Sequence, residues 1–177
     1  MKKSRIKNLL LLLLCGVVYF TFAVGSGTDV TTTSKDSNAQ SKTSEIAKYK
    51  LNEDIYITNS TGKYRLKFTD VTETNYRNEY YDQTANRVVI ISYEYENLTL
   101  PDNLYISSLD FRLYDQENNF LETYPAVDTK SPSSIGTGRK TTASEAFALN
   151  NDNNYIELDY YDNMFNSKAD CRVILEW

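Results

Sequence analysis

The chain contains no histidine among its 177 residues. Histidine supplies the base in Ser/His and Cys/His catalysis and is a common ligand of zinc, so these mechanisms and the usual zinc sites are excluded. Hydrolytic chemistry would have to depend on paired carboxylates or on lysine. The absence of histidine therefore narrows the enzymatic alternatives before any motif is considered.

Cysteine is also scarce, with only Cys15 and Cys171 present. Cys15 lies inside an uncharged, mostly apolar run, Leu9–Val24, and removal of that run would leave Cys171 alone. A single cysteine forms no intramolecular disulfide, so a core must hold the folded part together. In DCRVILEW (170–177) Cys171 alternates with polar neighbours, which predicts a small buried core residue rather than a reactive thiol.

The apolar run predicts an export signal, because the four cationic residues before it stay on the cytoplasmic side of a membrane. As a helix it would span about 24 Å, less than the roughly 30 Å hydrocarbon core of a bilayer. Ala23–Gly25 is a small-x-small sequence before Ser26, so a cleaved signal peptide and a retained membrane anchor both stay open. Large residues, Leu12–Leu14, precede Cys15 and disfavour its lipidation. Either way the rest of the chain is expected to be extracytoplasmic, membrane-anchored or secreted.

Composition divides the remaining chain into a linker and a domain. Residues 26–44 are rich in Ser and Thr and have almost no large apolar side chain to offset the entropy of ordering. From residue 45 the composition is that of a packed domain, and 14 of the 15 tyrosines lie there. We predict a signal peptide or N-terminal membrane anchor over 1–25, a flexible linker over 26–44 and one domain over 45–177.

The predicted domain is short of positive charge. Residues 45–177 contain 22 acidic and 13 basic side chains, a net charge of −9. Nucleic acids and anionic membrane surfaces are bound through Lys and Arg, so we expect no nucleic-acid partner and membrane contact only through the N-terminal segment. The negative charge also keeps an exported domain soluble.

Apolar and polar side chains alternate along several segments of the domain, which predicts half-buried antiparallel strands. The segments are YRLKF (64–68), RVVIISYEYEN (87–97), LDFRLYD (109–115), SEAFALN (144–150) and NYIELDYYD (154–162). In the third segment Leu109, Phe111 and Leu113 are expected on one buried face. Clusters rich in Asn, Asp, Ser and Gly separate the segments and favour turns. Seven or eight short strands predict an all-β, Ig-like two-sheet antiparallel sandwich, because a single sheet would leave one apolar face in water.

The order of these segments resembles a family of Ig-like, telokin-like domains of unknown function on envelope lipoproteins and secreted proteins of Gram-positive bacteria. The similarity rests on YKLNEDIYI (49–57), the strand that ends at Asn97, LDFRLYDQENN (109–119), GRKTTASEAFAL (138–149) and NYIELDYYD (154–162). The resemblance implies an exported Ig-like sandwich, and it brings no catalytic residue to carry over.

Several positions depart from the family's pattern. Asn52 stands where glycine is usual, Asn118–Asn119 replaces a hairpin glycine, and Thr137–Arg139 lacks the proline and the acid of a Pro-Gly-Glu turn. These positions form turns, so we expect the fold to be little affected. Members of the family commonly have a lipobox, and the poor one around Cys15 is a further departure.

Two patterns of oxygen-bearing residues are candidate sites. Residues 115–119 and 152–154 offer alternating ligands for calcium, but an EF-hand-like loop also needs a bend glycine and a distal Glu, so we expect turns and no metal site. Glu94 and Glu96 share one face of a strand, which leaves a secreted carboxylate-based hydrolase of cell-wall glycan as an alternative. Their place opposite an apolar face instead favours a solvated outer surface.

Tyrosines are the remaining candidates for a binding surface. Neighbours on a strand point to opposite faces, so at least one member of each adjacent pair, Tyr80–Tyr81 and Tyr160–Tyr161, is expected to be exposed. Tyr76, Tyr80 and Tyr81 occupy the longest polar interruption between two predicted strands, and exposed tyrosines suit recognition of proteins or glycans. We predict these three residues as a contact surface, and the alternative is a plain connecting loop.

These patterns together predict a non-catalytic binding or accessory module at the bacterial cell envelope, not an enzyme. Its expected partner is an envelope or extracellular protein, or a glycan, and no cofactor is expected. A purely structural spacer is the other alternative besides the hydrolase.

Overall fold

A computed structural model describes residues 45–81 and 85–177, which belong to one compact unit. The apolar run with Cys15 and the predicted linker lie outside the described residues. Within them the chain forms eight strands and one 3-10 turn. The elements are β1 (Ala47–Lys50), β2 (Ile55–Thr58), β3 (Lys63–Thr74), β4 (Arg87–Asn97), η1 (Ser108–Asp110), β5 (Phe111–Asp115), β6 (Arg139–Leu149), β7 (Tyr155–Tyr160) and β8 (Cys171–Glu176).

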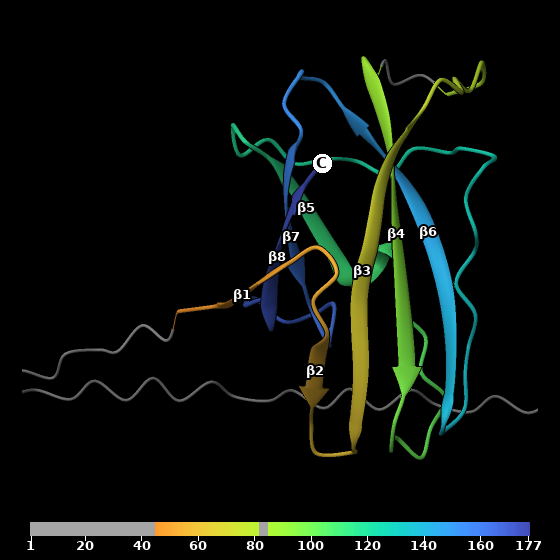
Figure 1. Cartoon of the computed structure of the whole chain (residues 1–177), viewed down its shortest axis with the longest axis vertical. Coiled ribbons are helices and arrows are strands. Elements are labelled where there is room, and N and C mark those ends of the chain that lie inside the picture. The colour runs from red at the N-terminus through yellow and green to blue at the C-terminus, as the bar shows by residue number, and fades with distance from the viewer. Residues whose placement is uncertain (1–44, 82–84) are drawn as a thin grey trace, which may run out of the picture. The chain divides into compact units, whose positions relative to one another are not determined.

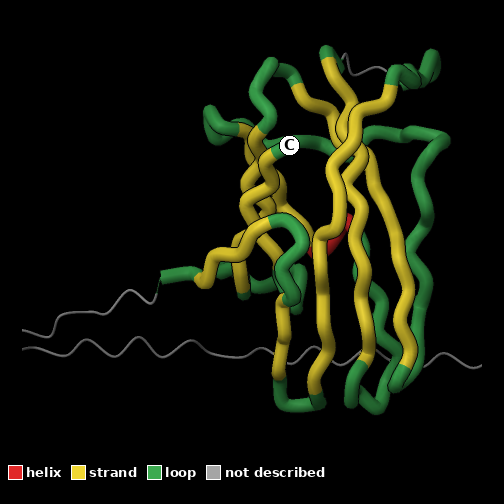
Figure 2. The backbone as a smooth tube through the Cα atoms, viewed as in Figure 1, coloured by secondary structure: helices red, strands yellow, loops and turns green. Residues whose placement is uncertain are grey.

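The strands form two four-stranded sheets that pack face to face (Figure 1). One sheet has the order β1-β8-β7-β5 and the other has the order β2-β3-β4-β6. Neighbouring strands are antiparallel, apart from β1 and β8, which run parallel with Ala47 opposite Cys171. Turns and loops join the strands at the two ends of the sandwich (Figure 2). The predicted all-β, Ig-like two-sheet sandwich is thereby confirmed.

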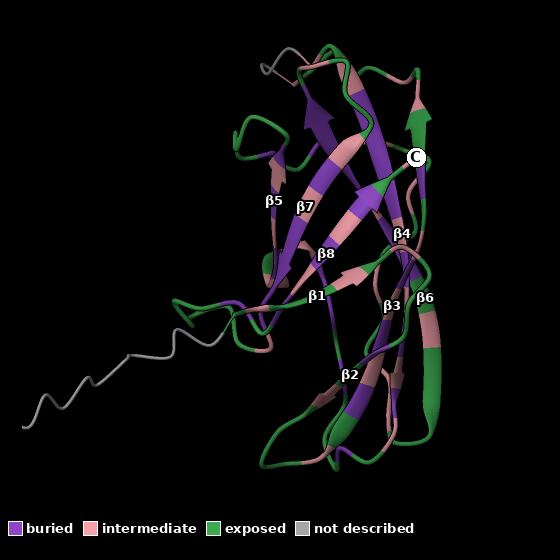
Figure 3. Ribbon diagram, turned by 60° about the vertical axis from the view of Figure 1, so that its left-hand side comes forward, coloured by how far each residue is buried: buried purple, intermediate pink, exposed green. Residues whose placement is uncertain are grey.

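Alternating side chains of both sheets meet in the interior, as the bands of buried residues along the strands show (Figure 3). Phe111 of β5 lies at the centre of an aromatic group that crosses between the sheets. Its ring centroid is 5.4 Å from that of Phe68, 5.2 Å from that of Tyr93 and 6.1 Å from that of Tyr160. Aromatic side chains bury large areas, so this group contributes strongly to the sandwich.

Two of the predicted strands, β3 and β6, are longer in the structure, and two others, β5 and β7, begin later than predicted. β3 continues past residue 68 to Thr74, with an irregularity in its pairing with β4 between Phe68 and Asp70 that bends the strand. β6 begins at Arg139, five residues before the predicted segment 144–150. The expectation that Leu109 is buried on one face with Phe111 was wrong. A capping box between Ser107 and Asp110 closes η1, and this turn rotates Leu109 out into solvent.

Asn52 and Asn118 adopt the backbone that glycine favours. Asn52 has φ = 69° and Asn118 has φ = 64°, and asparagine is one of the few side chains that tolerates this left-handed region. The Asn52 N–H donates to the Phe68 carbonyl at 2.8 Å, which fixes the turn where the chain passes from β1 to β2. Asparagine therefore occupies a left-handed position at both turns.

Candidate functional site

The three predicted contact tyrosines have different environments. Tyr80 is 94% exposed, whereas Tyr76 and Tyr81 pack against a small second cluster of buried residues. The ring of Tyr81 lies edge-on to that of Tyr124 with centroids 5.2 Å apart, and its hydroxyl donates to the Thr123 carbonyl at 3.0 Å. The structure thus places Tyr80 alone in solvent and gives the other two a packing contact.

The expectation of one exposed member in the pair Tyr160–Tyr161 was wrong, because both side chains are buried. Tyr160 points into the core, as the alternation of β7 requires. Tyr161 lies outside the core, but the Arg112 guanidinium covers its ring at 4.3 Å from the centroid. Burial is the main reason that the pKa of Tyr161 is raised above its ordinary value, with the Arg112 charge acting in the opposite direction.

The candidate acid pair is engaged by one arginine. Glu94 and Glu96 lie on the outer face of β4, and both carboxylates pair with the Arg65 guanidinium of β3, Glu96 at 3.0 Å. Arg65 also pairs with Asp54 at 2.8 Å, and Asp54 pairs with Lys67 at 2.9 Å. The two acids therefore belong to an ion-pair network on the sheet surface, as expected for a solvated face.

The candidate calcium loop at 115–119 is organised by a buried carboxylate. Asp115 accepts hydrogen bonds from the main-chain N–H groups of Glu117 and Asn119 and from the side-chain amides of Asn119 and Asn151, at 2.8–3.0 Å. Burial raises the pKa of Asp115, but these bonds outweigh it and leave the pKa below its ordinary value. No group of three or more Cys, Asp or Glu side chains in residues 45–81 and 85–177 is placed to hold a metal ion.

Of the two cysteines, only Cys171 belongs to the described residues. Cys171 is buried in the core of β8, as expected, and burial raises the pKa of its thiol to about 12. Cys15, the residue considered for lipidation, lies outside the described residues. Among the described residues no helix is both long and apolar enough to cross a membrane.

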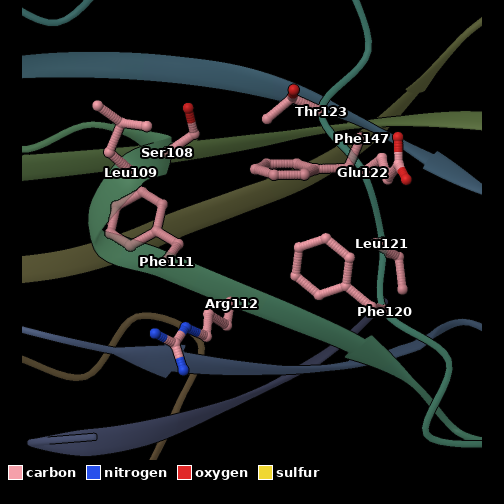
Figure 4. A pocket seen from close by; sticks show the side chains of 9 residues that line it. All are labelled: Ser108, Leu109, Phe111, Arg112, Phe120, Leu121, Glu122, Thr123 and Phe147. Atoms are coloured by element: carbon pink, nitrogen blue, oxygen red, sulfur yellow. The ribbon is translucent and has the colours of Figure 1, made fainter. Parts of the chain in front are cut away.

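A different feature is a concave site at one edge of the sandwich (Figure 4). It lies where η1 and β5 of one sheet face β6 of the other. The segment 119–124 crosses this gap: the Leu121 N–H donates to the Leu113 carbonyl of β5 at 2.9 Å, and the Tyr124 N–H donates to the Ala146 carbonyl of β6 at 2.7 Å. We call this site, lined by residues 108–109, 111–112, 120–123 and 147, the edge hollow. Its volume is about 430 Å³.

The lining of the edge hollow is mostly apolar. The rings of Phe111, Phe120 and Phe147 surround the space (Figure 4), and the side chains of Leu109 and Leu121 complete the lining. Leu109 is 69% exposed and Phe120 is 58% exposed. Phe120 is held at the rim by a bridge to Tyr114, whose ring centroid is 6.0 Å away. Exposed apolar side chains around a concave site are typical of binding surfaces.

Polar groups border the hollow at two sides. Ser108 and Arg112 come from the η1–β5 segment, and Glu122 and Thr123 come from the crossing segment. The Glu145 carboxylate behind η1 accepts hydrogen bonds from the Ser108 N–H at 2.8 Å and from the Tyr93 hydroxyl at 3.0 Å. These internal bonds fix the backbone of η1 and hence the position of Leu109.

Comparison with known proteins gives the fold and no family. No family model matches the chain, and no curated protein is similar to it in sequence. A secreted protein of Mycobacterium tuberculosis, MPT63, has a similar structure, with a TM-score of 0.57 and 14% sequence identity over 76% of this chain and 99% of that chain. The yjhA protein of Bacillus subtilis is similar with a TM-score of 0.52 and 16% identity, over 72% of this chain and 98% of that chain.

The edge hollow was not predicted from the sequence. The alternating pattern predicted a buried Leu109, and it singled out neither Arg112 nor Phe120. A weak signal existed, because Phe120 is a large apolar residue directly after the polar sequence DQENN, where nothing in the alternating pattern requires one. The hollow itself arises from residues 108–123 meeting Phe147, a contact between distant parts of the chain.

Proposed function

We propose that this protein is a non-catalytic binding or accessory module at the outer face of a bacterial cell envelope, and that the edge hollow is its contact surface. The observation that carries the proposal is the apolar hollow with Leu109 and Phe120 exposed at its rim. Soluble domains rarely leave large apolar side chains exposed around a concave site unless a partner covers them. The partner we propose is an envelope or extracellular protein.

The proposed location is extracytoplasmic. Two observations support it: the cationic residues followed by Leu9–Val24 at the N-terminus, and the structural similarity to a protein described as secreted. We further propose that the domain belongs to the Ig-like family of Gram-positive envelope proteins. The left-handed backbone of Asn52 and Asn118, at positions where that family has glycine, supports this assignment.

Site-specific photo-crosslinking in the producing cells tests the contact surface. A benzophenone amino acid at position 109 or 120 is expected to give a discrete adduct with a cell-surface protein. The matched control is position 56, because Tyr56 is 52% exposed on the other sheet. The edge hollow would be refuted as the contact surface if all three positions gave equal adducts, or if positions 109 and 120 gave none. Either result would favour the spacer alternative.

The intact mass of the native protein, recovered separately from membranes and from culture medium, tests the location. We expect either a full-length membrane form or a soluble form that begins near Ser26. A diacylglyceryl group on Cys15 would overturn our expectation about lipidation and keep the envelope location. Recovery of the unprocessed chain from the cytoplasm alone would refute the proposed location.

A further inference from the structure

The connection from β7 to β8 presents two neighbouring apolar side chains to solvent. Phe165 is 88% exposed, and Met164 beside it is also exposed. Residues 163–167 contain no charged side chain. We call these five residues the β7–β8 tip. Phenylalanine is one of the side chains with which proteins insert at the boundary between the headgroups and acyl chains of a bilayer.

Hydrogen bonds hold the β7–β8 tip in a defined turn. The Asn163 side-chain oxygen accepts the Phe165 N–H at 3.0 Å, and the Asn163 carbonyl accepts the Asn166 N–H at 2.9 Å. At the base of the tip the Asp162 N–H donates to the Asp170 carboxylate at 2.8 Å. Because the backbone is already fixed, insertion of the Phe165 ring into an apolar phase costs little further ordering.

The β7–β8 tip lies beside the point where the chain enters the domain. Residues 45–47 and 166–170 line a shared depression of the surface. Figures 1 and 3 show the connection from β7 to β8 next to the start of β1. This proximity follows from the register, because β1 runs parallel to β8 with Ala47 opposite Cys171. The tip is therefore at the end of the domain that the predicted linker precedes.

The length of the preceding chain keeps this end near a membrane when the apolar run is retained as an anchor. The predicted linker, 26–44, has 19 residues, and a flexible chain of that length has a root-mean-square span of about 25 Å. A group tethered by such a chain has an effective concentration in the millimolar range. One apolar side chain alone binds a membrane weakly, whereas two signals together give a stable contact. The linker therefore supplies the local concentration that a small insertion needs.

The negative charge of the domain does not exclude this contact. Membrane contact was expected only through the N-terminal segment because an acidic surface does not attract anionic lipids. The uncharged tip inserts by apolar burial, which does not depend on that attraction. At its base the Asp162 carboxylate accepts hydrogen bonds from the Tyr64 hydroxyl and the Asn59 side chain, so it is engaged by the domain itself.

We propose that the β7–β8 tip contacts the lipid surface in which the N-terminal segment is anchored, with Phe165 and Met164 inserted at the boundary between headgroups and acyl chains. This inference goes beyond the proposed function, and it depends on the membrane-retained form of the chain. The contact sets which end of the sandwich faces the bilayer.

Tyr80 lies at the opposite end of the sandwich and provides the matched control. The Asn86 side chain donates to the Asn150 carbonyl at 3.2 Å, so the loop that contains Tyr80 lies at the end where β7 begins. The tip lies at the end where β7 stops, and the six residues of this strand separate the two ends by about 20 Å. Tyr80 is also aromatic and almost fully exposed, but its end would face away from the bilayer.

Paramagnetic broadening by a labelled lipid tests the proposal. The full chain, ¹⁵N-labelled, would be held in nanodiscs of zwitterionic lipid with a nitroxide on the acyl chain near the headgroup. Broadening falls with the sixth power of distance, so the amide signals of Met164 and Phe165 should be broadened at least about fivefold more than that of Tyr80, which lies about 20 Å further away.

Variants assign the broadening to the apolar side chains. Phe165→Ser should reduce the broadening at the tip at least about fivefold, because the inserted ring is lost. Phe165→Trp should retain it, because tryptophan also inserts at this boundary. Tyr80→Ser should leave the broadening at the tip unchanged. Both positions are exposed, so all three variants are expected to fold.

Each alternative has its own result. Equal broadening at the tip and at Tyr80, or none at the tip, would overturn the inference. Broadening that persists undiminished in Phe165→Ser would also overturn it. Tip signals that shift with protein concentration in nanodiscs without nitroxide would show that a second copy covers the tip, and would overturn the lipid contact.

These results do not bear on the edge hollow, which photo-crosslinking at positions 109 and 120 tests separately. Recovery of the native protein only as a soluble form that begins near Ser26 would overturn the lipid contact and would leave the proposed extracytoplasmic location in place. Failure of this inference is therefore distinguishable from failure of the proposed function.

Discussion

The hydroxyl oxygens of Tyr64 in β3 and Tyr160 in β7 lie 2.6 Å apart in the interior, so a hydrogen bond between side chains joins the two sheets. The Tyr64 hydroxyl donates to the Asp162 carboxylate, and the Tyr160 hydroxyl must therefore donate to Tyr64. Asp162 also accepts from the side-chain amide of Asn59 at 3.0 Å. The chain of donors thus runs in one direction, from the core to the surface.

The direction of this chain predicts unequal effects of two similar substitutions. Tyr64→Phe removes the central link and leaves the buried Tyr160 hydroxyl without its acceptor, so the free energy of unfolding should fall by about 1–3 kcal/mol. Tyr160→Phe removes only the first donor and should cost about 0.5–1.5 kcal/mol. The double variant should cost little more than Tyr64→Phe alone, because the two residues share one bond. Urea unfolding of the three variants measures this; strictly additive costs would contradict it.

Gly62 predicts a steric effect in the turn between β2 and β3. A Cβ atom at this position would lie 2.9 Å from the Thr99 carbonyl oxygen and 3.0 Å from the Leu100 Cα, and both are backbone atoms that cannot rotate away. Gly62→Ala should therefore lower the free energy of unfolding by about 1–3 kcal/mol. Gly136→Ala is the control, because its Cβ would meet nothing closer than 3.5 Å. A thermal or urea transition in which both variants behave alike would refute the steric argument.

The fold was predictable because its signals are local and repeated. The alternation in RVVIISYEYEN predicts β4 with its observed bounds, and the turn clusters lie between strands. Asn52 and Asn118 were expected in turns, and asparagine supplies the left-handed backbone that these turns need. The error at Leu109 arose because a capping box overrides strand periodicity, and periodicity alone does not reveal it.

The candidate site was less predictable, because its environment is set by distant contacts. The sequence predicted Tyr81 in a polar loop, but the side chain packs on Tyr124, which is 43 positions later in the sequence. Nothing in the sequence singled out Arg112, and only the fold places its guanidinium on Tyr161. Exposure and pairing of a side chain depend on such tertiary neighbours, which a single sequence does not specify.

Asp110 and Asp115 predict opposite responses to pH. Burial raises the pKa of Asp110, and the charges of Glu145 and Asp162 add to this effect, although a hydrogen bond from the Ser107 N–H opposes it. A carboxyl whose pKa is higher in the folded state than in the unfolded state destabilises the fold when ionised. Its destabilising effect is present at neutral pH and is relieved as the pH falls through its folded pKa. For Asp115 the pKa is lowered, so its stabilising effect is present at neutral pH and is lost as the pH falls.

Asparagine substitutions separate these two cases. Asp110→Asn keeps an oxygen that can accept the Ser107 N–H and removes the charge, so this variant should be more stable than the natural chain at pH 7. Asp115→Asn should instead lose about 1.5–3 kcal/mol at pH 7, because the bonds to its carboxylate are charge-assisted. Both differences should shrink towards pH 4. Urea unfolding from pH 4 to pH 7 provides the measurement, and a shift of the same sign for both variants would contradict the assignment.

Tyr80 and Tyr81 allow a test of the contact surface that the sequence predicted. The test separates a loss of binding from a loss of stability. Tyr80 is almost fully exposed, so Tyr80→Ser should change the free energy of unfolding by no more than about 0.5 kcal/mol. Tyr81→Ser removes the ring contact with Tyr124 and the hydrogen bond to Thr123, and should cost about 1–3 kcal/mol. Thermal unfolding of the two variants measures this difference. If Tyr80→Ser abolishes binding of a partner and leaves stability unchanged, this loop takes part in binding. If only Tyr81→Ser abolishes binding, the cause is the disrupted packing around Tyr124. Equal destabilisation by the two substitutions would show that Tyr80 has a packing contact and would refute its placement in solvent.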